Sequence, residues 1–96
     1  MDYQVEIADY SFNPPDITIS VNDTVTWLNN DTIVHTATRT EAPPFDTGAI
    51  QPTSTSGPIA FIVASPASGF EYHCKPHPHM RGRIVVVEEH CLPQTP

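Results

Sequence analysis

Prolines are scattered along the whole chain and limit what it can fold into. The 96 residues include 11 prolines, and proline both breaks helices and interrupts the interior of sheets. No helix-length window repeats apolar residues at spacings of three and four. Short segments instead alternate apolar and polar residues with a period of two, as strands with one buried face do. The chain is therefore predicted to be all-β, with short strands joined by loops.

Segments of this kind indicate about eight strands. We expect strands at residues 3–7, 17–21, 24–28, 33–38, 59–63, 70–74 and 84–87. Asn22 and Asp23 are expected to form a tight hairpin turn, whereas residues 39–58 look loop-like. Many short strands separated by turn signals are typical of a Greek-key β-sandwich or barrel. Residues 1–89 are predicted to form one domain, followed by a short disordered tail at 90–96.

The charge balance excludes two classes of partner. Four basic and 11 acidic residues give a net charge of −7 with neutral histidines, whereas nucleic acids and anionic membranes bind basic surfaces. No apolar run approaches the roughly 20 residues that a membrane-spanning helix needs. We therefore expect no nucleic acid as a partner and no membrane span.

Residues 72–82 (Tyr-His-Cys-Lys-Pro-His-Pro-His-Met-Arg-Gly) hold most of the metal-ligating side chains. Two-residue gaps separate Cys74 from His77 and His77 from Met80. A thiolate, an imidazole and a thioether are soft or borderline ligands, which suit copper better than calcium or magnesium. Prolines on both sides of His77 restrict the backbone and favour one geometry for both oxidation states of a metal.

A trigonal site needs a second imidazole from another part of the chain. His35 is the only histidine outside residues 73–90. We therefore predict His35, Cys74 and His77 as strong ligands and Met80 as a weak axial ligand, which is the mononuclear blue-copper arrangement.

Several alternatives to this site remain open. His79 could take the place of His77, whereas His73 alternates with Cys74 and is expected to face away. Zinc would bind the cysteine and histidines without needing Met80. A cysteine–histidine nucleophile pair would make the protein an enzyme, although no glycine-rich oxyanion motif or orienting acid lies near Cys74.

The second cysteine, Cys91, lies in the proline-rich tail. We expect it to be a free thiol rather than the disulfide partner of Cys74, since sequence alone cannot establish the close Cα approach that a disulfide requires. His90, in the same tail, is expected to be solvated.

Three parts of the chain match one family pattern together: residues 23–27 (Asp-Thr-Val-Thr-Trp), His35, and residues 72–88. In these residues the sequence resembles the cupredoxins, and most closely the amicyanins. The two-residue gap between His77 and Met80 is similar to that of amicyanin, whereas plastocyanin and pseudoazurin have a longer gap. The resemblance implies an eight-stranded Greek-key sandwich, one type 1 copper and single-electron transfer. It implies the same four ligands: His35, Cys74, His77 and Met80.

Three features depart from the family pattern, and the first, Asn22 where the family usually has glycine, is tolerated in the same turn geometry. Thr36 follows His35 where amicyanin and plastocyanin usually have asparagine, which in the family helps to fix the ligand loop. The reduction potential is therefore not carried over from the family, because bonds around the ligands tune it. Residues 39–58 do not resemble amicyanin, so its partner is not carried over either.

The basic residues gather near the predicted site. They are Arg39, Lys75, Arg81 and Arg83, and no acidic residue occurs between positions 72 and 87. We expect a basic copper end that docks an acidic redox partner, with association that weakens as salt rises.

The predicted function is the carriage of single electrons between partner proteins by one copper ion. The alternative is a copper oxidoreductase acting on a small molecule such as a nitrogen oxide, which would need an open coordination position beside Met80. Metal storage or delivery is a third alternative, but a stiff ligand loop opposes ready exchange. Because related family members are exported, we expect the protein in the periplasm or elsewhere outside the cytoplasm, with its leader removed. We also expect it to be a monomer.

Overall fold

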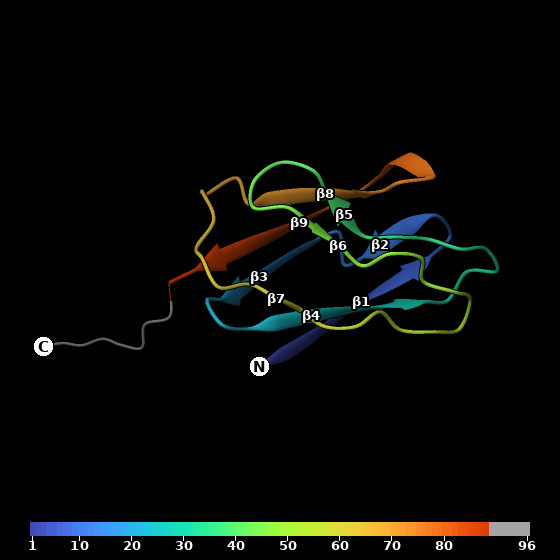
Figure 1. Ribbon diagram of the computed structural model, residues 1–96, viewed down its shortest axis with the longest axis horizontal. Helices are drawn as coiled ribbons and strands as arrows, with labels where there is room; N and C mark the ends of the chain where they lie inside the picture. Colours follow the sequence, from blue (N-terminus) through green and yellow to red (C-terminus); the bar gives the residue numbers. More distant parts are fainter. Residues whose placement is uncertain (89–96) are drawn as a thin grey trace, which may run out of the picture.

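Two β-sheets face each other and enclose one apolar core (Figure 1). The computed structural model describes residues 1–88, so Cys91, His90 and the predicted tail lie outside the described residues. The strands are β1 (Asp2–Ala8), β2 (Ser11–Asn13), β3 (Asp16–Ser20), β4 (Thr24–Asn29), β5 (Thr38–Arg39), β6 (Phe45–Asp46), β7 (Ile59–Ala60), β8 (Phe70–Cys74) and β9 (His77–Val87). Within the described part of the chain, no helix is long and apolar enough to cross a membrane. The prediction of an all-β sandwich is confirmed.

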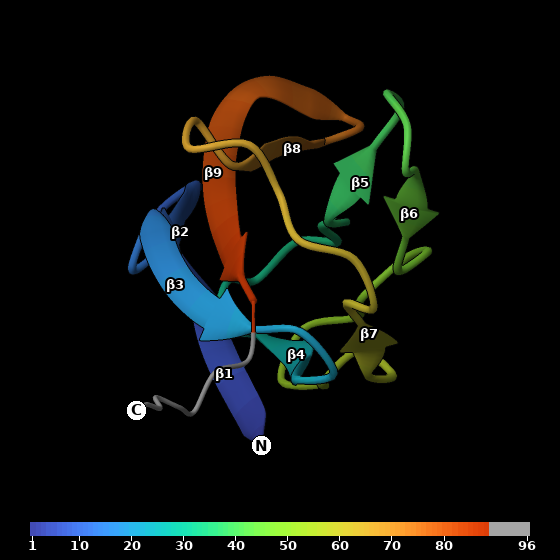
Figure 2. The ribbon, with the colours of Figure 1, turned by 90° about the vertical axis from the view of Figure 1, so that its left-hand side faces the viewer.

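The sheets contain both parallel and antiparallel pairs. One sheet has the order β2-β1-β4-β7 and the other the order β3-β9-β8-β5-β6. β1 runs parallel to β4, and β3 runs parallel to β9. In the end-on view of Figure 2 the strands curve around a common interior. The chain thus crosses repeatedly between the sheets, and residues distant in sequence meet at each end of the sandwich.

An aromatic cluster fills the interior between the sheets. Trp27 is fully buried, and its indole N–H donates a hydrogen bond of 3.1 Å to the hydroxyl of Tyr72. The rings of Phe12 and Phe45 pack against the Tyr72 ring with centroid distances of 4.7 and 5.9 Å. Burial raises the pKa of Tyr72, so this hydroxyl stays neutral. The cluster ties β4 of one sheet to β8 of the other.

Residues 20–23 form the predicted turn, but this turn does not make a hairpin. The Asp23 backbone N–H donates to the Ser20 carbonyl over 3.0 Å, and Asn22 has a φ of 80°, which asparagine tolerates better than most residues. β3 pairs with β9 while β4 pairs with β1, so the turn leads from one sheet to the other. The hairpin prediction is wrong because turn residues specify a reversal of the chain, not the sheet that receives the next strand.

The strand predicted at residues 33–38 is also wrong. Residues 35–39 are all buried, so the segment lacks the alternating burial of a one-sided strand. His35 makes only an isolated bridge to Ile50, and strand pairing resumes at β5. By contrast, residues 75–83, which were not among the expected strands, lie mostly in β9. Their polar and proline residues occupy exposed or half-buried positions, which hid the strand.

Gly82 lies opposite Tyr72 in the β8–β9 pair and has no room for a side chain. A Cβ atom at this position would lie within 3.0 Å of the Tyr72 ring, whose hydroxyl is held by Trp27. Because the ring cannot move without breaking that contact, Gly82→Ala is expected to lower the free energy of unfolding by about 1–3 kcal/mol. Urea denaturation measures this change.

Gly57 provides the matched control, because a Cβ there would meet no atom within 4 Å. Gly57→Ala is expected to change the unfolding free energy by less than about 0.5 kcal/mol. Equal stabilities of the two variants would show that the Tyr72 ring yields to the added methyl group.

Candidate metal centre

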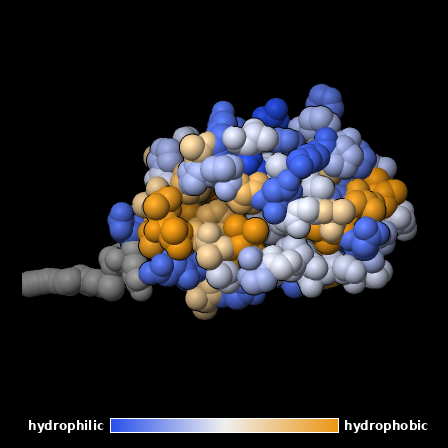
Figure 3. Space-filling view, viewed as in Figure 1, coloured by the Kyte–Doolittle hydropathy of each residue, from blue (hydrophilic) through white to orange (hydrophobic). Residues whose placement is uncertain are grey.

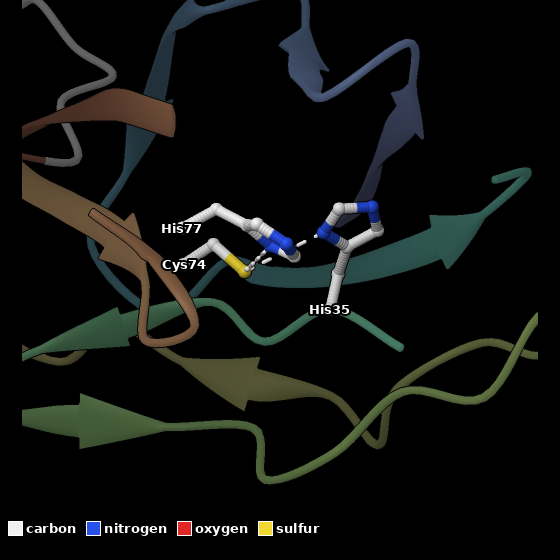
Figure 4. Close-up of side chains that lie close together, drawn as sticks. All are labelled: His35, Cys74 and His77. Carbon is white, nitrogen blue, oxygen red and sulfur yellow. Dashed lines mark hydrogen bonds between the residues drawn. The ribbon is translucent and has the colours of Figure 1, made fainter. Parts of the chain in front are cut away.

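Three side chains from two parts of the chain meet at one end of the sandwich (Figure 4). His35 lies in the connection between β4 and β5, Cys74 ends β8, and His77 begins β9. The Nδ1 atoms of His35 and His77 lie 3.4 and 3.5 Å from the Cys74 Sγ. All three donor atoms lie within 4.8 Å of one another. The structure therefore brings together the three side chains predicted as strong ligands.

A tight turn between β8 and β9 sets the relation of Cys74 to His77. Only Lys75 and Pro76 separate these residues, which are directly opposite in the strand register. Opposite residues of an antiparallel pair project from the same face of the sheet. The two-residue gap in the sequence thus places the thiol and the imidazole side by side.

A carboxylate fixes the tautomer of His35. The Nε2 atom of His35 lies 2.7 Å from a carboxylate oxygen of Asp31. A carboxylate accepts hydrogen bonds, so the neutral imidazole carries its proton on Nε2 and turns the lone pair of Nδ1 toward the sulfur. This imidazole is therefore held in the orientation and tautomer that a metal ligand requires.

The same carboxylate also accepts backbone hydrogen bonds from the turn between β1 and β2. The N–H groups of Asp9 and Tyr10 donate to Asp31 over 2.7 and 3.1 Å. Both residues have positive φ, at 53° and 59°. Burial disfavours the charge of Asp31, but these N–H groups and His35 outweigh it and hold the pKa of the carboxyl below its ordinary value. Asp31 is therefore ionised at neutral pH.

An aromatic ring covers both imidazoles. The Tyr10 ring packs edge-on against His35 and His77, with centroid distances of 5.7 and 5.0 Å. Sequence reasoning missed Tyr10 and Asp31. Asp31 had one available signal, its place four residues before His35, but nothing in the local sequence links Tyr10 to either histidine.

Hydrogen bonding reaches the sulfur as well. The backbone N–H of Thr36 points at the Cys74 Sγ over 3.4 Å. The Thr36 hydroxyl accepts a hydrogen bond of 3.0 Å from the backbone N–H of Lys75. Thr36 thus connects the His35 segment to the β8–β9 turn, although the family usually has asparagine at this position.

The other candidate residues have different surroundings. Met80 is buried with 4% exposure and belongs to the apolar core. His79 is exposed and lies outside the three-donor cluster. His73 lines a polar cleft together with Glu41 and Arg81, as expected for a side chain that alternates with Cys74.

The donor set fits a copper ion, and the spacing of the donor atoms suits a transition-metal ion. With the metal–sulfur and metal–nitrogen bonds of about 2.3 and 2.0 Å that zinc sites show, a trigonal arrangement would separate the sulfur from each nitrogen by about 3.7 Å. The sulfur–nitrogen distances of 3.4 and 3.5 Å are close to this value. One thiolate and two imidazoles form the trigonal set typical of blue-copper sites.

Comparisons with known proteins agree with this chemistry. Amicyanin from Paracoccus denitrificans is 32% identical over an alignment of 88 residues, with 85% of this chain and 63% of the relative covered. Amicyanin-alpha from Methylorubrum extorquens is 28% identical, with 86% of this chain and 70% of the relative covered. The crystal structure of amicyanin from Paracoccus versutus superposes with a TM-score of 0.77 at 26% identity, over 86% of this chain and 78% of that chain.

A family model gives the same assignment. Residues 1–87 match the model described as copper binding proteins, plastocyanin/azurin family. This match covers nearly all of the described residues and both parts of the donor cluster. The chain therefore belongs to the plastocyanin/azurin family of copper-binding proteins.

Proposed function

We propose that this protein carries single electrons between partner proteins. His35, Cys74 and His77 would hold one type 1 copper ion, with Met80 as a weak axial ligand. Bound copper supplies the Cu(II)/Cu(I) couple, which takes up and releases one electron. The observation that carries the proposal is the convergence of one sulfur and two Nδ1 atoms within 4.8 Å at one end of the sandwich.

The chain contributes a rigid arrangement of these donors. Asp31 orients His35, the two-residue turn sets Cys74 against His77, and the Thr36 N–H faces the sulfur. Side chains held in this way need little rearrangement when the charge at the site changes. Electron transfer is favoured by such preorganisation because little reorientation of solvent and protein groups accompanies it.

The route for the electron is proposed to pass through His77. His35 and Cys74 are completely buried, whereas His77 is only partly buried. Figure 3 shows apolar side chains on the surface at the end of the sandwich that carries the β4–β5 connection, and others toward the opposite end. A partner protein at the end with the β4–β5 connection would therefore contact the imidazole edge of His77 but not the buried side chains of His35 and Cys74.

The expected basic docking surface is smaller than the sequence indicates. Arg39 is buried and donates to the backbone carbonyls of Glu71 and Ala42, so it is not available to a partner. Its guanidinium also lies 4.8 Å from the centroid of the Phe70 ring. Arg39 therefore has a structural role.

Two further cations are already paired. Lys75 contacts Asp46 over 2.7 Å, and Arg83 contacts Asp16 over 3.1 Å. Arg81 is exposed and has no carboxylate partner among residues 1–88. We therefore propose that Lys75, which keeps 58% of its side chain exposed, and Arg81 form the contact with an acidic partner.

Electron exchange with an anionic reagent tests this surface. The rate of oxidation by ferricyanide is expected to fall between about 0.01 and 0.1 M ionic strength, because the screening length shortens from about 30 to 10 Å. Arg81→Gln should flatten this dependence. A rate that rises with salt in the native protein would show that the net charge of −7 dominates instead.

The proposed activity itself is tested by redox cycling of the copper-loaded protein. One reducing equivalent of ascorbate is expected to bleach the visible band, and ferricyanide should restore it in full. Added azide or nitrite should leave the spectrum unchanged. A spectral change with azide, together with consumption of nitrite, would favour a copper oxidoreductase over an electron carrier.

A location outside the cytoplasm is part of the proposal. The cytoplasm keeps free copper scarce, and the curated relatives are amicyanins. Since the chain spans 63% of the length of the Paracoccus denitrificans relative, its own partners have to be identified directly. Cell fractionation should recover the protein as a monomer from the periplasmic or extracellular fraction.

A further inference from the structure

A ring of hydrogen bonds begins at the residue that follows Cys74. It is made by Lys75, Thr36, Thr38 and Asp46. The backbone N–H of Lys75 donates to the Thr36 hydroxyl over 3.0 Å. That hydroxyl lies 2.9 Å from the hydroxyl of Thr38, which donates to Asp46 over 3.0 Å. The ammonium group of Lys75 closes the ring by contacting the second carboxylate oxygen of Asp46 over 2.7 Å. The ring therefore joins β5 and β6 to the turn that carries the ligands.

The hydrogen-bond directions in this ring are fixed by chemistry. An ionised carboxylate only accepts, so the Thr38 hydroxyl donates to Asp46 and must accept from Thr36. The Thr36 oxygen is then free to accept from the Lys75 N–H. Both paths from Lys75 thus end on the same carboxylate, and aligned hydrogen bonds of this kind strengthen one another.

The carboxylate at the end of the ring is itself held in place. Asp46 pairs with Thr38 in the β5–β6 register and accepts a further hydrogen bond of 2.9 Å from the backbone N–H of Gly48. Thr36 and Thr38 are 7% and 3% exposed, so water does not compete for their hydroxyls. The Lys75 ion pair lowers the pKa of Asp46, with help from Gly48 and Thr38.

We propose that Asp46, which lies outside the three-donor cluster, is a positioning residue for the copper centre. Through Thr38 and Thr36 it fixes the Lys75 backbone, and with it the turn between Cys74 and His77. The same path holds the Thr36 segment where its N–H meets the Cys74 sulfur. This inference rests on the proposed copper site, but it does not depend on which partner exchanges electrons with it.

The buried path through the threonines should matter more than the ion pair. Exposed ion pairs contribute little to stability, and the Lys75–Asp46 pair is exposed at both ends, with 58% and 38% exposure. Asp46→Ala removes the acceptor and leaves a buried hydroxyl without its partner, whereas Asp46→Asn keeps an oxygen in the same place. The conservative variant is therefore expected to rescue the positioning.

Amide hydrogen exchange of the copper-free protein provides the first measurement. In Asp46→Ala, the Lys75 N–H is expected to exchange about tenfold faster or more, relative to amides in the middle of β9 that report overall unfolding. Asp46→Asn should stay near the native rate. Asp16→Ala, which removes the Arg83 ion pair but no member of the ring, is the matched control and should leave the Lys75 amide unchanged.

Copper(II) affinity, measured by competition with a chelator, provides the second measurement. Asp46→Ala is expected to bind copper about 10–100-fold more weakly, while Asp46→Asn and Asp16→Ala remain close to native. Thr38→Val interrupts the ring at another point and should weaken copper binding to a similar extent. This variant tests the proposal independently if Asp46→Ala does not fold. Combining both substitutions should add little to either one, because residues of one network are not additive.

The outcomes separate this inference from the proposed function. A Lys75 amide that exchanges at its native rate in both Asp46→Ala and Thr38→Val would overturn the positioning role. A native protein that binds no copper would instead overturn the proposed function, because the amide measurement needs no metal.

Discussion

Cys74→Ser is expected to abolish the intense visible absorption of the copper-treated protein. Transfer of charge from a thiolate to Cu(II) gives rise to this band, and a serine hydroxyl is a much harder ligand. The substitution barely changes the volume of a side chain that is completely buried, and the Thr36 N–H that faces the sulfur can donate to the new oxygen. The variant should therefore fold and stay colourless, as visible absorption during a cupric-ion titration will show.

His79→Ala is the matched control for this experiment. His79 belongs to the same hairpin but is exposed and lies outside the donor cluster, so the variant should keep the full band. Loss of the band in His79→Ala would make His79, rather than His77, the second imidazole of the site. An intact band in Cys74→Ser would remove the thiolate from the metal centre.

Asp31→Ala is expected to weaken copper(II) binding by about 10–100-fold, the usual effect of losing the partner of a ligand histidine. The substitution frees the His35 ring to rotate and to move its proton to Nδ1, the atom that faces the sulfur. It also leaves the N–H groups of Asp9 and Tyr10 without their acceptor. Both residues are in a sparsely populated backbone conformation, which these hydrogen bonds help to hold. Competition with a chelator measures the change in affinity.

Two variants and a pH series sharpen this prediction. Asp31→Asn keeps an acceptor oxygen and should lose less affinity, while Asp2→Ala, at the opposite end of β1, should lose none. The pKa of Asp31 is lowered from its ordinary value of 3.8, so its stabilising charge is present above that value and is lost only as the pH falls below it. The native protein should therefore bind copper more tightly than Asp31→Ala throughout the range of about pH 5 to 7. Equal affinities of the two proteins would exclude Asp31 from the support of His35.

The closeness of Cys74 and His77 could be predicted from the sequence, but the residues that hold the ligands in place could not. The gap between Cys74 and His77 is local, and a two-residue turn converts it directly into proximity. His35 followed by elimination, because few histidines were available. Asp31 and Tyr10 contact His35 only because the β1–β2 turn meets the β4–β5 connection. Such contacts between distant segments leave no periodic pattern in the sequence.

The fold shows the same division. Alternation identified β1, β3, β4 and β8, because each presents one face to the core for five residues or more. β6, with two residues, is too short for a period of two to be seen, and residues 39–58 therefore looked like a plain loop. Asp46 lies in this strand, so its ring with Thr36 and Thr38 could be found only from the folded chain.

Titration of the purified protein with cupric ion decides whether the chain holds one copper ion through Cys74. Metal analysis and visible absorption are followed together as copper is added. We expect uptake to saturate at one ion per chain, with the visible band growing in step and reaching its maximum at the same point. A protein that stays colourless and takes up no stoichiometric copper would contradict the proposed centre and the function built on it.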